Sequence, residues 1–293
     1  MFNNLFIFNS KNVPKAAVFV CLLLILGSIA SYFTYNIRLK EHQIYKIFHG
    51  AINADVLIVG SSRAQYHIDP VLIEARTGLK SYNIGISGGG SSHQLFILEQ
   101  YLKHNKVPKH IIINVEYQNL QENLFANKFD INMYELFLVE KDIFKLYSKQ
   151  RLSRLIYLMI FPFEANDFFL FIPKDTSNGS RTFDRKYQDN EGLTTRSFTV
   201  YPDKESINLS KELIMLAKRN SQVTVVYSPE LKLINNEREV IDALNIIMSD
   251  EQVKFYNHKH YLADTKYFFD AYHLNKIGRA KYTDNLIKLI FNK

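Results

Sequence analysis

Short apolar runs alternate with amphipathic stretches along most of the chain after residue 50. This alternation is typical of β-α units arranged around a parallel sheet. We expect strands over residues 55–59, 80–84, 110–115, 222–227 and 253–256. We expect longer helices over residues 91–104, 204–219, 237–249 and 276–291.

A shorter helix is expected between the first two strands. Asp69 precedes Pro70, which is the usual pairing of an N-cap residue with proline at the first helical position. Gly78 then marks the end of the helix, because glycine readily adopts the left-handed conformation in which many helices stop.

The regular alternation stops between residues 120 and 201. This stretch contains aromatic segments over residues 161–163 and 168–171, followed by a polar stretch over residues 174–195. We interpret it as an insertion into the α/β domain. It either covers the functional site, contacts a partner or lies against a bilayer, or its apolar residues simply enlarge the core.

An uncharged, apolar stretch covers residues 16–35. About 20 helical residues with a rise of about 1.5 Å each match the roughly 30 Å hydrocarbon core of a bilayer. The stretch lacks the polar face of a helix that packs on a soluble core. We therefore expect a single transmembrane helix in the inner or plasma membrane.

A cleavable signal peptide is the main alternative for this stretch. Ser28 and Ala30 fit a cleavage site, but the apolar run is longer than a usual signal core and its aromatic end resembles an interfacial anchor. Positive charges lie on both sides, so charge alone does not fix the orientation. We expect an uncleaved anchor, with a cytoplasmic N-terminus over residues 1–15, the membrane helix over 16–35, a linker over 36–52 and an extracytoplasmic (periplasmic) domain over 53–293.

Composition narrows the classes of function. Of the 293 residues, 47% are hydrophobic and 22% are charged, which suits a folded domain with a substantial core. The net charge of +7 is spread along the chain and accompanies no nucleic-acid-binding motif, so we expect no nucleic-acid partner. Cys21 is the only cysteine, which excludes a disulfide framework and a cysteine-rich metal site.

Candidate chemistry begins directly after the first predicted strand. Residues 59–63 read Val-Gly-Ser-Ser-Arg, so Ser62 lies where a parallel strand ends and a tight turn leads into a helix. Side chains at that place point out of the sheet edge where ligands of such folds bind. Gly-Ser-Ser is also ordinary loop composition, so the motif alone carries little weight.

A glycine-rich turn follows the second predicted strand. Residues 83–90 read Asn-Ile-Gly-Ile-Ser-Gly-Gly-Gly. Glycines there let backbone N–H groups approach a bound oxygen, as an oxyanion hole or a phosphate cradle requires. The spacing matches neither G-x-x-x-x-G-K-[ST] nor G-x-G-x-x-G, which argues against a nucleotide-binding module. A plain flexible turn is the other interpretation.

Asp270 and His273 precede the last predicted helix. A spacing of three residues lets a carboxylate reach one imidazole nitrogen across a turn, while the other nitrogen faces a serine. A single histidine is usually structural, but this pair follows a serine-containing turn in the same α/β pattern. We therefore expect Ser62, His273 and Asp270 to form a catalytic triad.

In their order along the chain, these serine, glycine and Asp-x-x-His blocks resemble the SGNH, or GDSL-like, hydrolase superfamily. The resemblance extends from residue 55 to the C-terminus apart from the insertion, and it implies a three-layer α/β fold with a flavodoxin-like parallel sheet. Matched by position, Ser62 is the nucleophile and Ser61 replaces a common aspartate. The resemblance further implies that the N–H groups of Ser62 and Gly88 form an oxyanion hole.

The Gly-Ser-Ser block and the N-terminal apolar helix look most like proteins that acylate cell-surface polymers, of the teichoic-acid D-alanylation and polysaccharide O-acetylation types. This implies an esterase or O-acyltransferase acting on acyl esters, acetyl esters first, of a cell-envelope polysaccharide or other acylated polymer. It also implies a membrane-bound O-acyltransferase as partner. The triad requires no cofactor or metal, and the sequence does not distinguish water from a glycan hydroxyl as acceptor.

One block departs from the superfamily pattern. Residues 114–119 read Asn-Val-Glu-Tyr-Gln-Asn where Gly-x-Asn-Asp is usual. We expect Asn119, or alternatively Gln118, to supply the third oxyanion donor. Losing one such donor typically lowers kcat about 10²- to 10³-fold. The alternative is therefore a catalytically silent scaffold that assists a membrane acyltransferase, which the intact triad argues against.

Other candidates carry less weight. Arg63 either meets an anionic substrate or forms a surface salt bridge. His258 and His260 alternate so that both rings would share one strand face, but no carboxylate or cysteine lies close to them in the sequence. We therefore treat them as surface histidines rather than as metal ligands.

Overall fold

The computed structural model describes residues 18–29, 43–121, 177–184, 187, 196–219 and 221–292. The chain divides into two compact units. One consists of Met1–His42 and Tyr134–Lys174, and the other consists of Gln43–Met133 and Asp175–Lys293.

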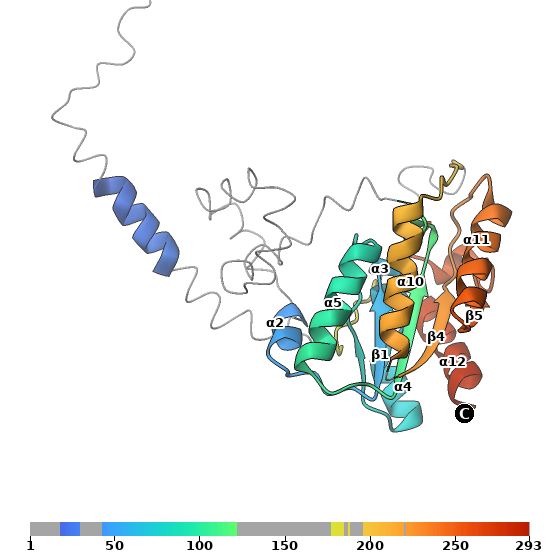
Figure 1. Ribbon diagram of the computed structural model, residues 1–293, viewed down its shortest axis with the longest axis horizontal. Helices are drawn as coiled ribbons and strands as arrows, with labels where there is room; N and C mark the ends of the chain where they lie inside the picture. The colour runs from blue at the N-terminus through green and yellow to red at the C-terminus, as the bar shows by residue number, and fades with distance from the viewer. Residues whose placement is uncertain are drawn as a thin grey trace, which may run out of the picture. The chain divides into compact units, whose positions relative to one another are not determined.

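The second unit contains a five-stranded sheet in which all neighbouring strands are parallel, in the order β2-β1-β3-β4-β5 (Figure 1). Its strands are β1 (Val56–Gly60), β2 (Ser81–Asn83), β3 (His110–Val115), β4 (Gln222–Tyr227) and β5 (Lys254–Asn257). The sequence predicted all five within about a residue, and the expected parallel α/β fold, consistent with a flavodoxin-like sheet, is confirmed.

Helices cover both faces of the sheet. The helices are α2 (Gln43–Phe48), α3 (Ser62–His67), α4 (Pro70–Thr77), α5 (Ser91–His104), α10 (Lys204–Lys218), α11 (Glu237–Asp250) and α12 (Lys276–Phe291), with short 3-10 turns η3 (Tyr117–Asn119) and η4 (Thr265–Tyr267). Helices α5 and α10 pack side by side on one face (Figure 1), whereas α3 and α4 pack against α12. The fold therefore has three layers.

The strands form because their residues are apolar throughout and are covered on both sides. All residues of β1 are buried, which is the pattern expected of a central parallel strand. One core cluster joins Ile58 of β1, Ile112 of β3 and Val226 of β4 to the inner sides of α3, α4 and α12. Burial on both faces explains why these runs do not alternate between apolar and polar residues.

The predicted caps of α4 are confirmed. The side chain of Asp69 accepts hydrogen bonds from the backbone N–H groups of Val71 and Leu72, at 3.0 and 3.3 Å. Gly78 ends the helix with φ of +74°. These local contacts fix the length of α4 and return the chain to the amino end of β2.

Helical structure in this unit begins within the segment expected to be a linker. Helix α2 buries Ile44, Ile47 and Phe48 and packs against α5. Asn105, which follows α5, donates from its side chain to the carbonyl oxygen of Ile47 at 2.7 Å. Residues 43–52 are therefore packed onto the α/β core.

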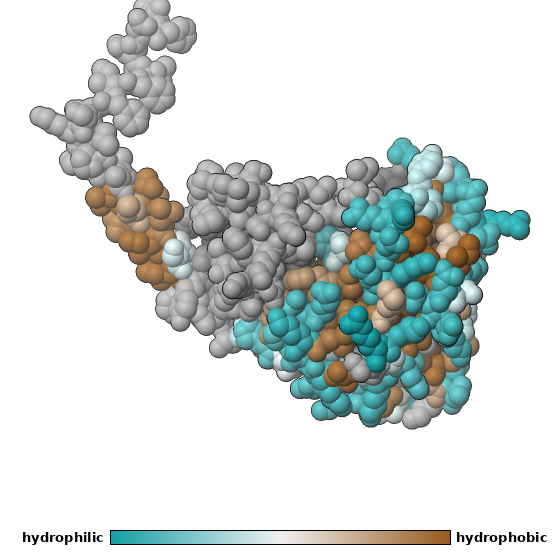
Figure 2. All heavy atoms as spheres, viewed as in Figure 1, coloured by the Kyte–Doolittle hydropathy of each residue, from teal (hydrophilic) through white to brown (hydrophobic). Residues whose placement is uncertain are grey.

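Residues 18–29 form a helix that covers the middle of the expected membrane span, and its visible side chains are almost all apolar in Figure 2. Within the described ranges, no helix combines the length and the hydropathy needed to cross a bilayer. Residues 1–17, 30–42, 122–176, 185–186 and 188–195 lie outside the described residues, and with them lie the remainder of the expected span and most of the expected insertion.

Replacing Ile112 with alanine tests the importance of the central core. Ile112 is fully buried in the middle of β3, so we expect Ile112→Ala to lower the free energy of unfolding by about 2–5 kcal/mol. Urea denaturation followed by circular dichroism measures this loss. Val71→Ala is the control, because Val71 is 45% exposed on α4 and its truncation should change stability by only about 0.5 kcal/mol. Equal losses in the two variants would contradict the assignment of this core.

Candidate active site

Ser62 is the first residue of α3, directly beyond the end of β1. Gly60 ends the strand with φ of +152°, and a Cβ at this position would lie 2.7 Å from the carbonyl oxygen of Asn114 on β3. Glycine is therefore required for the turn. Ser61 then caps α3 by accepting a hydrogen bond from the N–H of Arg63 at 3.2 Å. This turn places Ser62 at the carboxyl edge of the sheet.

Ser62, His273 and Asp270 form one hydrogen-bonded row. Ser62 Oγ lies 2.9 Å from His273 Nε2, although the two residues are 211 positions apart. His273 Nδ1 lies 2.9 Å from Asp270 Oδ2 and 3.1 Å from Oδ1. Because a carboxylate can only accept, Nδ1 donates to Asp270, which leaves Nε2 to accept the Ser62 hydroxyl proton. The structure therefore brings together the three side chains singled out in the sequence.

Asp270 is held as a carboxylate by its own turn. The backbone N–H groups of Tyr272 and His273 both donate to Asp270 Oδ1 at 2.8 Å. Burial acts to raise the pKa of Asp270, but the hydrogen bond and charge of His273, with these two N–H groups, outweigh it and hold the pKa below its usual value of 3.8. The carboxylate can therefore orient the imidazole at neutral pH.

His67 of α3 contacts the turn that carries His273. Nothing in the sequence pattern pointed to this residue. His67 Nε2 accepts the backbone N–H of Leu274 at 3.1 Å, so Nδ1 carries the proton and donates to Ser228 Oγ at 2.8 Å. Burial, and to a lesser degree the charges of Arg63 and His273, lower the pKa of His67 well below 6.5. His67 is therefore a neutral link between α3, the residue after β4 and the His273 turn.

Three half-buried aromatic rings stack in a row, and two of them contact the imidazole of His273. Tyr66 stacks on Phe183 with ring centroids 4.2 Å apart, and Phe183 stacks on Phe269 at 3.9 Å. The imidazole of His273 meets Tyr66 edge-on at 5.3 Å and Phe183 at 6.0 Å. Phe183 comes from the expected insertion and is tied to α12 by the hydrogen bond from the N–H of Lys276 to its carbonyl oxygen. A described part of the insertion thus lies next to the candidate triad.

The glycine-rich turn is joined to the serine turn. The N–H of Ile86 donates to the carbonyl oxygen of Gly60 at 3.0 Å, and Ser87 Oγ donates to Gln65 Oε1 on α3 at 2.9 Å. Gly88 has φ of +73°, a conformation that favours glycine. No described residue accepts a hydrogen bond from the N–H of Gly88. The N–H of Ser62 belongs to the first residue of α3 and has no acceptor within that helix, so these two groups are the candidate oxyanion donors.

The structure places Asn119 away from the role expected for it. Asn119 is fully buried, and its side-chain nitrogen donates to Ser91 Oγ at 3.0 Å and to Gln94 Oε1 at 3.3 Å. Its side-chain oxygen accepts the N–H of Glu116 at 2.9 Å. The side-chain amide of Asn119 thus has its hydrogen-bond partners in the first turn of α5 and at the start of η3. Gln118, the alternative donor, contacts the hydroxyl of Tyr117 at 3.4 Å.

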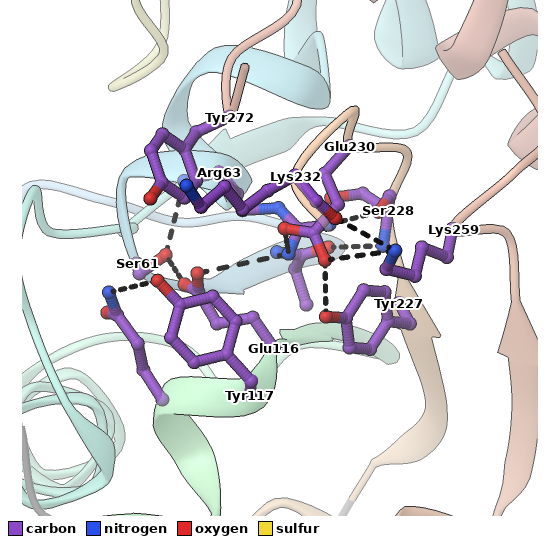
Figure 3. A network of polar contacts seen from close by, with 12 residues as sticks. Ser61, Arg63, Glu116, Tyr117, Tyr227, Ser228, Glu230, Lys232, Lys259 and Tyr272 are labelled. Atoms are coloured by element: carbon purple, nitrogen blue, oxygen red, sulfur yellow. Dashed lines mark hydrogen bonds and ion pairs between the residues drawn. The ribbon is translucent and has the colours of Figure 1, made fainter. Parts of the chain in front are cut away.

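Arg63 is buried, whereas the sequence interpretations placed it either against an anionic substrate or in a surface salt bridge. Its side chain is 1% exposed. Figure 3 shows its guanidinium group among carboxylates, where Nη1 lies 3.1 Å from Glu230 Oε2 and Nη2 donates to the carbonyl oxygen of Ser228. The guanidinium also lies over the ring of Tyr227, 4.7 Å from its centroid. These contacts correct the expectation that Arg63 faces solvent or an anionic substrate.

Further buried partners extend this network beyond β4. Tyr227 donates its hydroxyl to Glu230 Oε1 at 2.6 Å. Lys259 Nζ lies 2.7 Å from Glu237 Oε2 and 3.9 Å from Glu230 Oε1 (Figure 3 labels Tyr227, Glu230 and Lys259). The sequence did not predict a role for either glutamate. Glu230 lies before α11 and Glu237 is its first residue, and neither belongs to a recognisable motif.

His258 and His260 have different surroundings. His258 Nδ1 lies 3.3 Å from the hydroxyl of Tyr282, whereas His260 Nε2 lies 2.6 Å from Glu237 Oε1. Both follow β5 rather than sharing a strand face. Among the described residues, no group of three or more His, Cys, Asp and Glu side chains is placed to hold a metal ion.

No family model matches the chain, and no curated protein matches it. Solved structures do resemble it in fold. One, provisionally described as a platelet activating factor from Streptococcus pneumonia, has a TM-score of 0.47 and 14% identity, covering 89% of this chain and 98% of that chain. Another, an acetyl xylan esterase from the rumen bacterium Butyrivibrio proteoclasticus, has a TM-score of 0.37 and 11% identity, covering 81% of this chain and 63% of that chain. These similarities are too distant to assign a family or an activity.

Replacing Asp270 with asparagine should change how stability depends on pH. The pKa of Asp270 is lower in the folded state than in the unfolded state, so the stability it contributes is present above the unfolded value and is lost as pH falls through the folded value. We expect the unfolding free energy of the wild type to fall more steeply below about pH 5 than that of Asp270→Asn. Urea titrations at a series of pH values measure the two curves.

The control for this experiment is Asp242→Asn on α11, whose carboxylate is 62% exposed. This variant should follow the wild-type curve. Parallel curves for the wild type and Asp270→Asn would contradict the proposed stabilisation of the Asp270 carboxylate.

Proposed function

We propose that this chain is a serine ester hydrolase or O-acyltransferase with Ser62 as its nucleophile. The observation that carries the proposal is the row of hydrogen bonds from Ser62 Oγ through His273 to Asp270. A hydroxyl that faces one nitrogen of an imidazole, while a carboxylate holds the other nitrogen, is the arrangement that activates serine for attack on an ester.

In the first half of the proposed reaction, Ser62 Oγ attacks the carbonyl carbon of an acyl ester while its proton passes to His273 Nε2. The carbonyl oxygen becomes an oxyanion, which the N–H groups of Ser62 and Gly88 stabilise. Collapse of this intermediate breaks the ester bond, and the leaving alcohol takes the proton from His273. The acyl group remains on Ser62.

In the second half, an acceptor hydroxyl gives its proton to His273 and attacks the acyl group on Ser62. Water as acceptor releases a carboxylic acid, whereas a glycan hydroxyl yields a new ester. Either acceptor restores the Ser62 hydroxyl. The stacked rings of Tyr66, Phe183 and Phe269, of which the first two contact His273, suit the apolar face of a sugar or an acyl group.

The proposed substrate is an acylated, in the first instance acetylated, polysaccharide or other polymer of the cell envelope. The apolar stretch over residues 16–35 supports a single-pass anchor that holds the domain on the extracytoplasmic side. A membrane-bound O-acyltransferase is the proposed partner, since it would supply or share acyl groups at the same surface. The proposed reaction uses no cofactor.

A catalytically silent scaffold for such an acyltransferase is the second candidate. One observation favours it: the side-chain nitrogen of Asn119 is bound to Ser91 and Gln94, which leaves the proposed oxyanion hole with two backbone donors. Removing one donor from an oxyanion hole typically lowers kcat about 10²- to 10³-fold. The ordered triad favours a slow enzyme over an inactive one.

Replacing Ser62 with alanine tests the enzyme against the scaffold. We expect the full-length wild type to hydrolyse a chromogenic acetyl ester and to be labelled by a serine-reactive fluorophosphonate. Ser62→Ala should abolish labelling and lower kcat by at least about 10⁴-fold, because it removes the nucleophile. The matched control is Ser221→Ala before β4, whose hydroxyl donates to the carbonyl oxygen of Pro108. A folded wild type with neither hydrolysis nor labelling would support the scaffold.

The proposed anchor can be tested separately by extracting cell membranes with alkaline carbonate. A chain that spans the bilayer stays in the membrane pellet. A Leu24→Arg variant should be released in part, because an arginine near the bilayer centre opposes insertion by about 2.5–3.5 kcal/mol. Release of the wild-type chain into the supernatant would rule out a transmembrane anchor.

A further inference from the structure

The hydroxyl of Ser61, next to the proposed nucleophile, is held by two buried partners (Figure 3). It donates to Oε1 of Glu116, which follows β3, and it accepts the backbone N–H of Arg63 at 3.2 Å. Ser61 is 1% exposed and Glu116 is 3% exposed. Rotating this hydroxyl away would leave buried polar groups unpaired, at a cost of about 1–3 kcal/mol. The Ser61 side chain therefore has one strongly preferred orientation.

Glu116 is fixed in turn by the third block of the sequence. The backbone N–H of Asn119 donates to the carbonyl oxygen of Glu116 at 2.9 Å, and the side chain of Asn119 accepts the N–H of Glu116 at 2.9 Å. Oε2 of Glu116 lies 3.9 Å from Nη1 of Arg63. Ser61, Glu116 and Arg63 thus close a ring of contacts, because Arg63 supplies an N–H to Ser61 and a positive charge to Glu116. Asn119, expected to touch an oxyanion, instead fixes the backbone of Glu116.

This ring of contacts bears on the peptide group between Ser61 and Ser62. Ser61 has φ of −88° and ψ of −156°, the extended conformation in which an N-cap side chain reaches the first turn of its helix. The same ψ angle sets the direction of the N–H of Ser62. That N–H belongs to the first helical residue and has no acceptor within the helix. Loss of the Ser61 contacts would let this peptide group turn.

We propose that Ser61 and Glu116 are a positioning pair that holds the N–H of Ser62 toward the oxygen of a bound ester carbonyl. The inference rests on the proposed function, because it assigns this N–H to the oxyanion hole. Neither side chain touches the reacting atoms; both act through the peptide group. The side-chain nitrogen of Asn119 donates to Ser91 and Gln94, so the oxyanion would be stabilised by the backbone N–H groups alone. The direction of each N–H therefore matters more.

The test compares variants of the full-length chain that remove or retain the contact. Ser61→Ala and Glu116→Ala should lower kcat about 10²-fold and leave KM close to the wild-type value, because the contact with the oxyanion forms only in the transition state. Glu116→Gln keeps an acceptor oxygen for Ser61 and should recover most of this loss. The measurements are kcat and KM for a chromogenic acetyl ester, and the rate of labelling by a fluorophosphonate.

Two further variants separate positioning from general stability. Ser61→Gly introduces a residue that is accepted at N-cap positions and removes the whole side chain, the hydroxyl included, so it replaces Ser61→Ala if that variant fails to fold. Ser81→Ala at the amino end of β2 removes another buried serine hydroxyl, which donates to the carbonyl oxygen of Leu79 at 2.8 Å. Ser81→Ala should keep the wild-type kcat, with circular dichroism and thermal unfolding reporting the fold of every variant.

The outcomes distinguish this inference from the proposed function. If the folded wild type neither turns over ester nor reacts with fluorophosphonate, the proposed function fails, and the pair has no oxyanion donor to position. If the wild type is active and a folded Ser61→Gly or Ser61→Ala variant matches it in kcat, the positioning pair alone is overturned. A rise in KM at unchanged kcat, or Glu116→Gln as slow as Glu116→Ala, also overturns it.

Discussion

The geometry of the candidate site depends on the buried ion pair between Arg63 and Glu230. Arg63 belongs to α3 and Glu230 follows β4, 167 positions later, and both side chains are at most 1% exposed. Breaking such a pair by removing one partner costs about 3–5 kcal/mol, because the remaining charge is left in the interior. The pair therefore holds helix α3 against the residues that follow β4. His67, one helical turn beyond Arg63, is tied to the same region through Ser228.

The framework of the fold could be predicted because its signals are local. A strand such as β3 is an uninterrupted apolar run, and the side chain of Asp69 caps α4 through residues two and three positions away. The hydrogen-bonded row of Ser62, His273 and Asp270 was also predictable, since the three-residue spacing of Asp270 and His273 brings carboxylate and imidazole together within one turn. Placing Ser62 opposite them required only that parallel strands end at the same edge of the sheet.

What the sequence could not predict depends on partners that are remote along the chain. The burial of Arg63 was not predicted, because its counter-ion, Glu230, belongs to a loop without a motif. Asn119 looked available because Ser91 and Gln94, which accept its side-chain hydrogen bonds, precede it by 28 and 25 positions. A buried polar side chain is defined by the groups that satisfy it, and those groups are known only once the strands are in register.

The charges around Ser62, His273 and Asp270 favour a proton on His273 over a proton on neighbouring groups. The positive charge of Arg63 is met inside the protein by Glu230, and burial keeps the pKa of His67 well below 6.5, so that its ring stays uncharged at neutral pH. The rings of His67 and His273 lie only 6.4 Å apart, so a charged His67 would repel a second imidazolium. Because His67 is neutral and Asp270 is ionised, a proton taken from Ser62 can reside on His273 as part of an ion pair. The buried network thus removes competing charge from the neighbourhood of the imidazole, as the proposed acyl transfer requires.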